Sequence, residues 1–139
     1  MSDYAGDLSP LDTWSLLKST PAAVMVDVRT DAEWNFVGQP DLSSLNKAPI
    51  RLSWQIFPTM VLNGEFVDAV RAAVPDPATP IAFLCRSGVR SLAAARALTA
   101  VGYTACYNIA DGFEGPPDGE RHRGRVAGWK ASNLPWAQG

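Results

Sequence analysis

The sequence has little cysteine and almost no histidine, and both shortages exclude classes of protein. Its two cysteines, Cys85 and Cys106, form no CxxC pair, and His122 is the one histidine among 139 residues. Structural zinc sites need a cluster of such ligands, and disulfide frameworks need several cysteine pairs. We therefore expect no metal, no other cofactor and no disulfide framework.

Long apolar runs are also missing. The longest ones fall far short of the ~20 residues that a membrane-spanning helix needs. The first residues lack the basic and apolar regions of a secretory signal peptide. We therefore predict a cytoplasmic protein without a membrane partner.

A basic excess is absent too. The formal net charge is -2, so the chain as a whole has no field that would attract nucleic acid. Basic side chains cluster only near the C-terminus, at Arg121, His122, Arg123, Arg125 and Lys130. Because no aromatic stacking platform interleaves them, this cluster indicates a solvated surface, and we expect no nucleic-acid partner.

The length of 139 residues is typical of one domain with a substantial core. We assign residues 1–7 to an N-terminal tail and residues 8–137 to a single domain. Within it, the segment 116–139 contains Trp129 and Trp136, which we expect to dock on the body.

Strand and helix patterns alternate along the chain. The patterns predict helices over residues 10–18, from just after Arg29, over 66–73 and over 92–101; they predict strands over 23–28, 48–54, 81–84 and 103–109. Such alternation with short connections indicates a parallel, right-handed α/β sheet.

The most informative segment joins the apolar strand 81–84 to the helix that follows it. It consists of Cys85, Arg86, Ser87, Gly88, Val89, Arg90 and Ser91. A thiol between a strand and a helix start faces unpaired N–H groups and the positive end of the helix dipole, and the two arginines add positive charge. These groups favour the thiolate, which is the nucleophilic form of cysteine.

Cys106 lacks these features. It lies in an aromatic and β-branched run without an adjacent glycine loop or arginine, so we interpret it as a structural core residue. Asp27 and Arg29, by contrast, follow a predicted strand. The carboxyl ends of parallel strands meet at one edge of a sheet, so both residues should lie near Cys85.

On these residues the chain resembles the single-domain rhodanese, or rhodanese-like sulfurtransferase, family. The resemblance runs from about residue 8 to 137, and it is carried by segments 26–29, 33–34, 83–94, 102–103 and 108–115. It implies a three-layer α/β/α fold with a central, mostly parallel five-stranded sheet. It also implies that Cys85 accepts a sulfane sulfur as a persulfide, cradled by the loop from Arg86 to Ser91.

The resemblance implies a two-step transfer. A small anionic donor such as thiosulfate gives its outer sulfur to Cys85, and cyanide or a thiol then takes it. We expect Arg86 to contact the donor and leave a scaffolding role open for Arg90, with Asp27 as the candidate partner of such a scaffolding arginine. Arg29 is expected to order the wall of the crevice, and Glu33 to cap a helix.

One stretch departs from the family pattern. Where the family carries Gly-His-Ile-x-Gly-Ala, this chain has residues 37–42 without a histidine, and a longer connection through Asn46. The wall beside the site is therefore different here, which leaves the donor and the acceptor open. His122 lies in the polar tail, so we include no histidine base in the mechanism.

Other functions compete with this hypothesis. Phosphatases and arsenate reductases of similar fold place an arginine six residues after the cysteine, where this chain has Ser91, with Arg90 one residue earlier. A binding module without activity is disfavoured by the presence of Cys85. A sulfur carrier that serves a sulfur-accepting partner protein stays open, as does the choice between a monomer and a weak homodimer.

Overall fold

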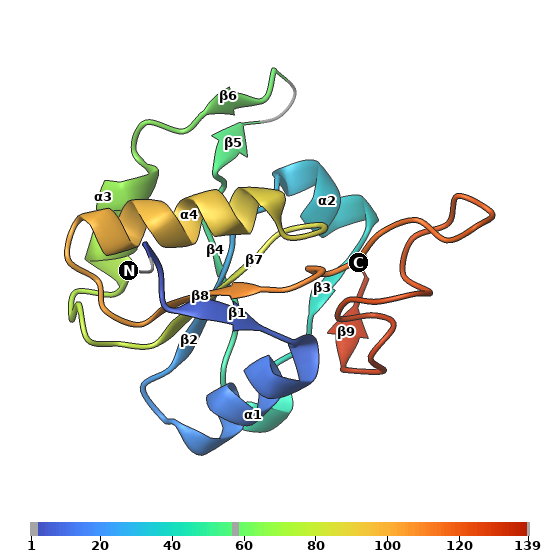
Figure 1. Cartoon of the computed structure of the whole chain (residues 1–139), viewed down its shortest axis with the longest axis horizontal. Coiled ribbons are helices and arrows are strands. Elements are labelled where there is room, and N and C mark those ends of the chain that lie inside the picture. The colour runs from blue at the N-terminus through green and yellow to red at the C-terminus, as the bar shows by residue number, and fades with distance from the viewer. Residues whose placement is uncertain (1–2, 57–58, 139) are drawn as a thin grey trace.

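A sheet of five parallel strands forms the centre of the computed structural model, which describes residues 3–56 and 59–138 (Figure 1). In spatial order the strands are β1 (Gly6–Leu8), β8 (Cys106–Ile109), β7 (Ile81–Leu84), β2 (Val24–Asp27) and β4 (Ile50–Arg51). Because all pairings are parallel, the loops that leave the strands meet at one edge of the sheet.

Helices cover both faces of the sheet. They are α1 (Pro10–Ser19), α2 (Asp31–Phe36), α3 (Phe66–Ala73) and α4 (Val89–Ala100), with a short 3-10 helix at Ser43–Leu45. Figure 1 shows α3 and α4 above the sheet and α1 below it, while α2 lies at the carboxyl edge. This arrangement confirms the predicted three-layer α/β/α fold with a five-stranded sheet.

The central strand β7 is buried on both faces, and its side chains alternate between two cores. Phe83 packs with Phe66 of α3 and Leu98 of α4. Ala82 and Leu84 belong to the opposite core. All four residues of β7 have no exposed surface, as expected for a strand between two helix layers.

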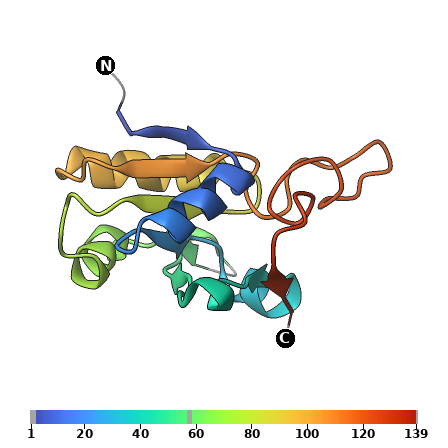
Figure 2. The same cartoon turned by 90° about the horizontal axis from the view of Figure 1, so that it is seen from below.

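Two short antiparallel ribbons lie outside the sheet. One pairs β3 (Gln39–Pro40) with β9 (Trp136–Ala137), and the other pairs β5 (Gln55–Ile56) with β6 (Val61–Leu62). Figure 2 shows the chain between β8 and β9 extending past the carboxyl edge of the sheet before it returns to β3. The C-terminal segment therefore contacts the body through β9 and the buried Trp129.

Several boundaries differ from the sequence-based prediction. The strands predicted over 48–54 and 103–109 are shorter, at Ile50–Arg51 and Cys106–Ile109. Residues 6 and 7, predicted to lie in a tail, belong to the edge strand β1, whose short Gly-Asp-Leu sequence carries no strand signal. Helix α4 begins at Val89 rather than Leu92, because Gly88 adopts a φ of 109° as the residue before the helix. Val89, Arg90 and Ser91 thus form the first helical turn and not an extended loop.

The described part of the chain contains no helix that is both long enough and apolar enough to cross a membrane.

Trp129→Ala should destabilise the protein by about 3–5 kcal/mol, because a fully buried indole is removed. Trp129 packs edge-on against Trp14 at a centroid distance of 6.0 Å and donates Nε1–H to the carbonyl of Pro135. Urea denaturation measures the loss. Trp136→Ala, which truncates a 41 % exposed side chain in the same segment, should cost clearly less. Equal losses would contradict the role given to Trp129.

Candidate functional site

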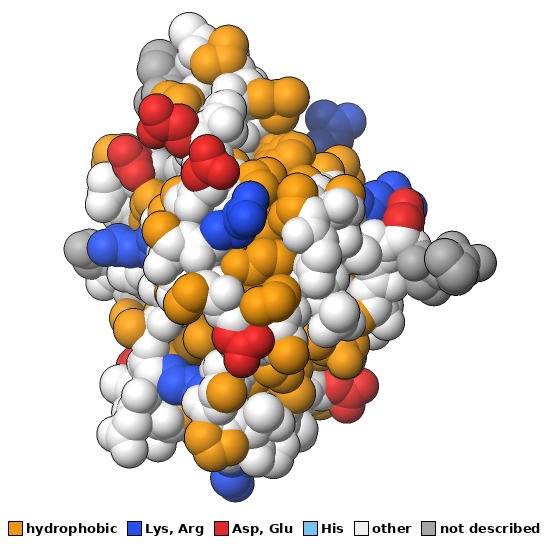
Figure 3. All heavy atoms as spheres, turned by 90° about the vertical axis from the view of Figure 1, so that its left-hand side faces the viewer, with side chains coloured by type: hydrophobic (Ala, Val, Ile, Leu, Met, Phe, Trp, Pro, Cys, Tyr) orange, Lys and Arg blue, Asp and Glu red, His pale blue; other side chains and the backbone are white. Residues whose placement is uncertain are grey.

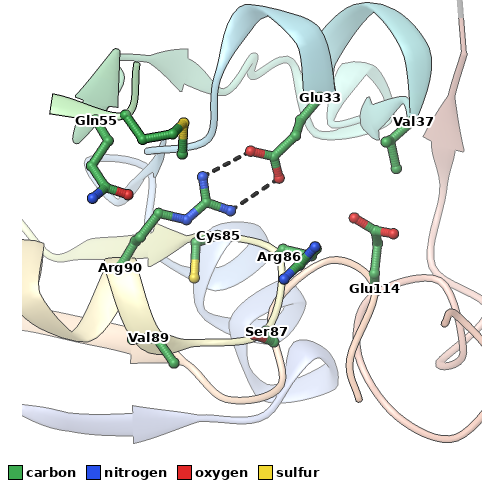
Figure 4. Close-up of a pocket in the computed structure, with 10 residues that line it drawn as sticks. Glu33, Val37, Gln55, Cys85, Arg86, Ser87, Val89, Arg90 and Glu114 are labelled. Atoms are coloured by element: carbon green, nitrogen blue, oxygen red, sulfur yellow. Dashed lines mark hydrogen bonds and ion pairs between the residues drawn. The ribbon is translucent and has the colours of Figure 1, made fainter. Parts of the chain in front are cut away.

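Cys85 lies directly after β7, at the base of a pocket of about 550 Å³ (Figure 4). The pocket is lined by Glu33, Val37, Gln55, Met60, Cys85, Arg86, Ser87, Val89, Arg90 and Glu114. Cys85 itself is only 1 % exposed. A thiol in this position meets ligands through the pocket and is otherwise shielded from solvent.

Two polar groups lie within hydrogen-bond distance of the sulfur of Cys85. The N–H of Gly88 lies 3.0 Å from Sγ, and the hydroxyl of Ser91 lies 3.2 Å from it. Both groups come from the start of α4, where the Gly88 N–H donates to the sulfur and the first turn presents further N–H groups without intrahelical acceptors. The site can therefore hold a negatively charged sulfur.

A second loop fixes the backbone of the Cys85 loop. The N–H of Phe113 donates to the carbonyl of Cys85 at 2.8 Å, and that of Glu114 donates to the carbonyl of Arg86 at 2.9 Å. Gly112 makes this approach possible, because a Cβ there would lie 2.3 Å from the Cys85 carbonyl oxygen.

Arg90 is held by Glu33 rather than by Asp27. Its two terminal nitrogens donate to the two carboxylate oxygens of Glu33 at 2.7 and 3.0 Å, as Figure 4 shows. Glu33 also caps α2 as predicted, through a reciprocal capping box with Thr30. Arg90 thus joins α4 to α2 across the pocket, which is the scaffolding role.

This ion pair sets the protonation of both partners. Burial alone would raise the pKa of Glu33, but the hydrogen bonds and charge of Arg90 outweigh it and hold that pKa below its usual value. Burial likewise opposes the charge of Arg90, and Glu33 more than compensates, so the pKa of Arg90 is raised.

Asp27 pairs with Arg29, which corrects its predicted pairing with an arginine of the Cys85 loop. The carboxylate accepts from Arg29 at 2.8 Å, and both side chains have no exposed surface. Asp27 ends β2 and Arg29 follows two positions later, so their side chains lie on one face. Arg29 also donates to the carbonyl of Gly38 at 2.8 Å and stacks on Phe113, 4.4 Å from its ring centroid.

The pocket brings predicted residues of the Cys85 loop together with Glu114 and Met60, which the sequence did not single out. Arg86 is exposed at its mouth, and Glu114 enters from the loop after β8, facing Val37 in Figure 4. Met60 and Val89 add apolar surface, being 38 % and 75 % exposed. Glu114 could have been found from the sequence, because it is an acid inside a glycine-rich loop that follows a strand. The sequence around Met60 carries no comparable signal.

Cys106 lies away from this pocket, inside the core formed with α3 and α4. Burial raises the pKa of its thiol to about 11, against a weaker opposing contact from Thr99. This environment agrees with the interpretation of Cys106 as a core residue.

Other surfaces offer less chemistry. On the face drawn in Figure 3, Lys and Arg side chains stand apart from one another among apolar ones. A second hollow of about 390 Å³ is lined by Arg71, Ala72, Pro75, Pro77, Val101 and Tyr103, without a thiol or a carboxylate. His122 is exposed, and the described residues contain no cluster of potential metal ligands.

Related sequences cover nearly the whole chain. The family described as "STR4 middle domain" matches residues 6–139. An uncharacterized protein of Rickettsia conorii is 46% identical over 124 residues, which are 88% of this chain and 89% of that protein. The chloroplastic rhodanese-like domain-containing protein 4 of Arabidopsis thaliana is 27% identical over 94% of this chain and 25% of its own length.

Solved structures show the same fold. The crystal structure of Rv0390 from M. tuberculosis superposes with a TM-score of 0.90 at 48% identity, over 98% of this chain and 99% of that chain. The polysulfide-sulfur transferase homodimer of Wolinella succinogenes gives 0.67 at 23% identity, over 99% and 80%. A rhodanese-like domain protein of Staphylococcus aureus gives 0.52 at 20% identity, over 77% and 86%. The fold of this chain is therefore rhodanese-like.

Alkylation should distinguish the two thiols. At neutral pH, iodoacetamide should modify Cys85 through the pocket and leave Cys106 unmodified, because the buried Cys106 thiol has a pKa of about 11 and stays protonated. Peptide mass mapping identifies the modified residue. Preferential modification of Cys106 in the folded protein would contradict the assignment of the reactive thiol.

Glu33→Gln should remove the ion pair with Arg90 while keeping a side chain that can cap α2. A carboxylate with a lowered pKa stabilises the fold above its unfolded pKa, and this contribution is lost as the pH falls through the folded value. The variant should therefore be less stable by about 1–2 kcal/mol at pH 7 and equal to wild type in acid. Urea denaturation across pH tests this, with the exposed Glu65→Gln as the control; a difference that persists in acid would contradict it.

Proposed function

The chain belongs to the STR4 middle domain family, and from this membership and its rhodanese-like fold we propose that it is a sulfurtransferase that carries a sulfane sulfur as a persulfide on Cys85. The observation that carries the proposal is the Gly88 N–H, which points at the Cys85 sulfur at 3.0 Å from the start of α4. A helix start that faces a sulfur stabilises both a thiolate and a persulfide anion.

The proposed reaction has two balanced steps. The Cys85 thiolate attacks the outer sulfur of thiosulfate, a sulfur–sulfur bond forms, and sulfite leaves with the electron pair of the broken bond. Cyanide or a thiolate then attacks the outer sulfur of the persulfide, and the Cys85 thiolate is regenerated. No external oxidant or reductant is needed, and ping-pong kinetics follow from the covalent intermediate.

The remaining site residues support this chemistry in different ways. Arg86 is the exposed cation at the mouth and would contact an anionic donor. Ser87, Gly88 and Val89 offer backbone N–H groups to the outer sulfur. Arg90 holds α2 against α4 through Glu33, so it shapes the pocket rather than neutralising the donor.

A protein partner is the second candidate acceptor. The pocket of about 550 Å³ is in the size range of drug-sized ligands and larger than a small inorganic anion needs. Its rim includes the exposed apolar side chains of Met60 and Val89. These features favour a sulfur carried on an organic or protein thiol, in which case the chain acts as a sulfur carrier. A phosphatase-like reaction is disfavoured, because Arg90 is engaged by Glu33.

The deciding experiment is intact mass after incubation with thiosulfate, or with a polysulfide as a second donor. Wild type and Cys106→Ser should each gain one sulfur atom that cyanide removes as thiocyanate, whereas Cys85→Ser should gain none while keeping its fold by circular dichroism. A gain of sulfur on Cys85→Ser but not on Cys106→Ser would show that Cys106, and not Cys85, carries the sulfur. No gain with either donor on any variant would overturn the sulfurtransferase proposal.

The acceptor is identified by following the loaded protein. Fast loss of the sulfur to cyanide supports the enzyme described above. Slow loss to cyanide with fast loss to a protein thiol supports the carrier function.

A further inference from the structure

A chain of hydrogen bonds leads from the reactive sulfur to the edge of the sheet. The Ser91 hydroxyl lies 3.2 Å from Cys85 Sγ and 2.5 Å from Asn108 Oδ1. The Asn108 amide donates through Nδ2 to the Asp7 carboxylate at 3.1 Å. Asp7 lies on β1 directly opposite Asn108 on β8, so the sheet register fixes this contact.

The chemistry of Asp7 determines the direction of the whole chain. A carboxylate accepts hydrogen bonds and donates none, so Asn108 must turn its NH₂ toward Asp7. This leaves the Asn108 oxygen facing Ser91. Because Ser91 has a single hydroxyl proton, it can donate either to Asn108 or to Cys85, but not to both.

The two protonation states of Cys85 need different arrangements of this proton. The thiol can donate its S–H to Ser91 while Ser91 donates to Asn108, which satisfies every group. The thiolate has no proton and is stabilised only if the Ser91 hydroxyl donates to it. The oxygens of Ser91 and Asn108 then face each other without a proton between them. Ser91 is fully buried and Asn108 only 5 % exposed, so bulk water cannot easily replace the lost bond.

We infer that Asp7 and Asn108 are positioning residues that orient the Ser91 hydroxyl away from Cys85 and so restrain the thiolate. The role in catalysis rests on the proposed sulfurtransferase function. In the persulfide, the inner sulfur carries no proton and little charge, so Ser91 can keep its bond to Asn108. The network therefore restrains the free thiolate more than the sulfur-loaded form.

The other charged groups around Cys85 are arranged independently of this network. Arg90 is held by Glu33, and Asp27 by Arg29. Arg86, directly after Cys85, and Glu114, in the loop after β8, also line the pocket. On β1, Asp7 additionally accepts from the hydroxyl of Tyr4 at 2.9 Å. Replacing Asp7 thus changes the network without breaking either ion pair of the site.

Asp7→Asn is the test, because an amide at this position lets the Asn108 amide reverse and donate to Ser91, whose proton then turns to Cys85. Alkylation of Cys85 by iodoacetamide at neutral pH should become about fivefold faster, the factor that corresponds to one hydrogen bond of about 1 kcal/mol. The pH profile of alkylation should move to lower pH. Cys106 does not line the pocket and its thiol has a pKa of about 11, so the signal comes from Cys85; the Cys106→Ser background checks this directly.

Asp3→Asn is the matched control. It removes the same charge near the N-terminus, but Asp3 pairs with Arg96 at 2.9 Å rather than with Asn108. An equal acceleration in both variants, abolished by high salt, would show a through-space charge effect and overturn the inference. An unchanged rate in Asp7→Asn would overturn it as well.

Asn108→Ala completes the test, since it removes the competing acceptor directly. It should accelerate alkylation at least as much as Asp7→Asn, and Asp7→Asn should add nothing in its background. Independent, additive effects would overturn the inference. Alkylation measures the reactivity of the Cys85 thiol and needs no sulfur donor. Failure of sulfur loading in wild type would therefore overturn the proposed function, while the alkylation rates would still test the role of Asp7 and Asn108.

Discussion

The site depends on the close approach of two backbone segments. The loop after β7 is bound to the loop after β8 through N–H groups that donate to the carbonyls of Cys85 and Arg86. Gly112, with a φ of 60°, brings the second loop closer than a residue with a Cβ would allow. With these carbonyls directed toward the second loop, the N–H of Gly88 is left to face the sulfur. An anion site is thus produced by backbone geometry before any charged side chain contributes.

Parallel pairing makes this approach possible, and a buried ion pair supports it. The register of β7 with β8 places both loops at the same edge. Arg29 and Asp27 add a fixed charge pair beneath them, and Arg29 stacks on Phe113 of the second loop. A buried pair contributes little net stability after desolvation, so its main effect here is to determine how the loops are arranged. Removal of one partner would leave an uncompensated charge under the site.

Much of this arrangement could be predicted from local patterns. The apolar run at β7, the capping box of α2 and the cysteine before a glycine and a helix are features of neighbouring residues, and they located the strand, the helix and the thiol. Contacts between segments far apart in the sequence produce no local pattern of this kind. The pairing of Arg90 with Glu33 depends on the order of the strands in the sheet. The pairing of Asn108 with Asp7 depends on β1, which has only three residues and no strand signal. The tertiary register that creates these pairs is not encoded in any one segment.

The stretch that departs from the rhodanese pattern and the C-terminal segment form one structural unit. Strand β3, within residues 37–42, pairs with β9, and Asp41 donates its N–H to the carbonyl of Pro135. Lys130 Nζ donates to the carbonyl of Val37, which lines the pocket. Burial lowers the pKa of Lys130, which stacks over Trp136. The tail therefore supports this wall of the pocket. Under the proposed function, a change where Val37 meets the tail should alter the preference for donor or acceptor while leaving the loop that contains Cys85 intact.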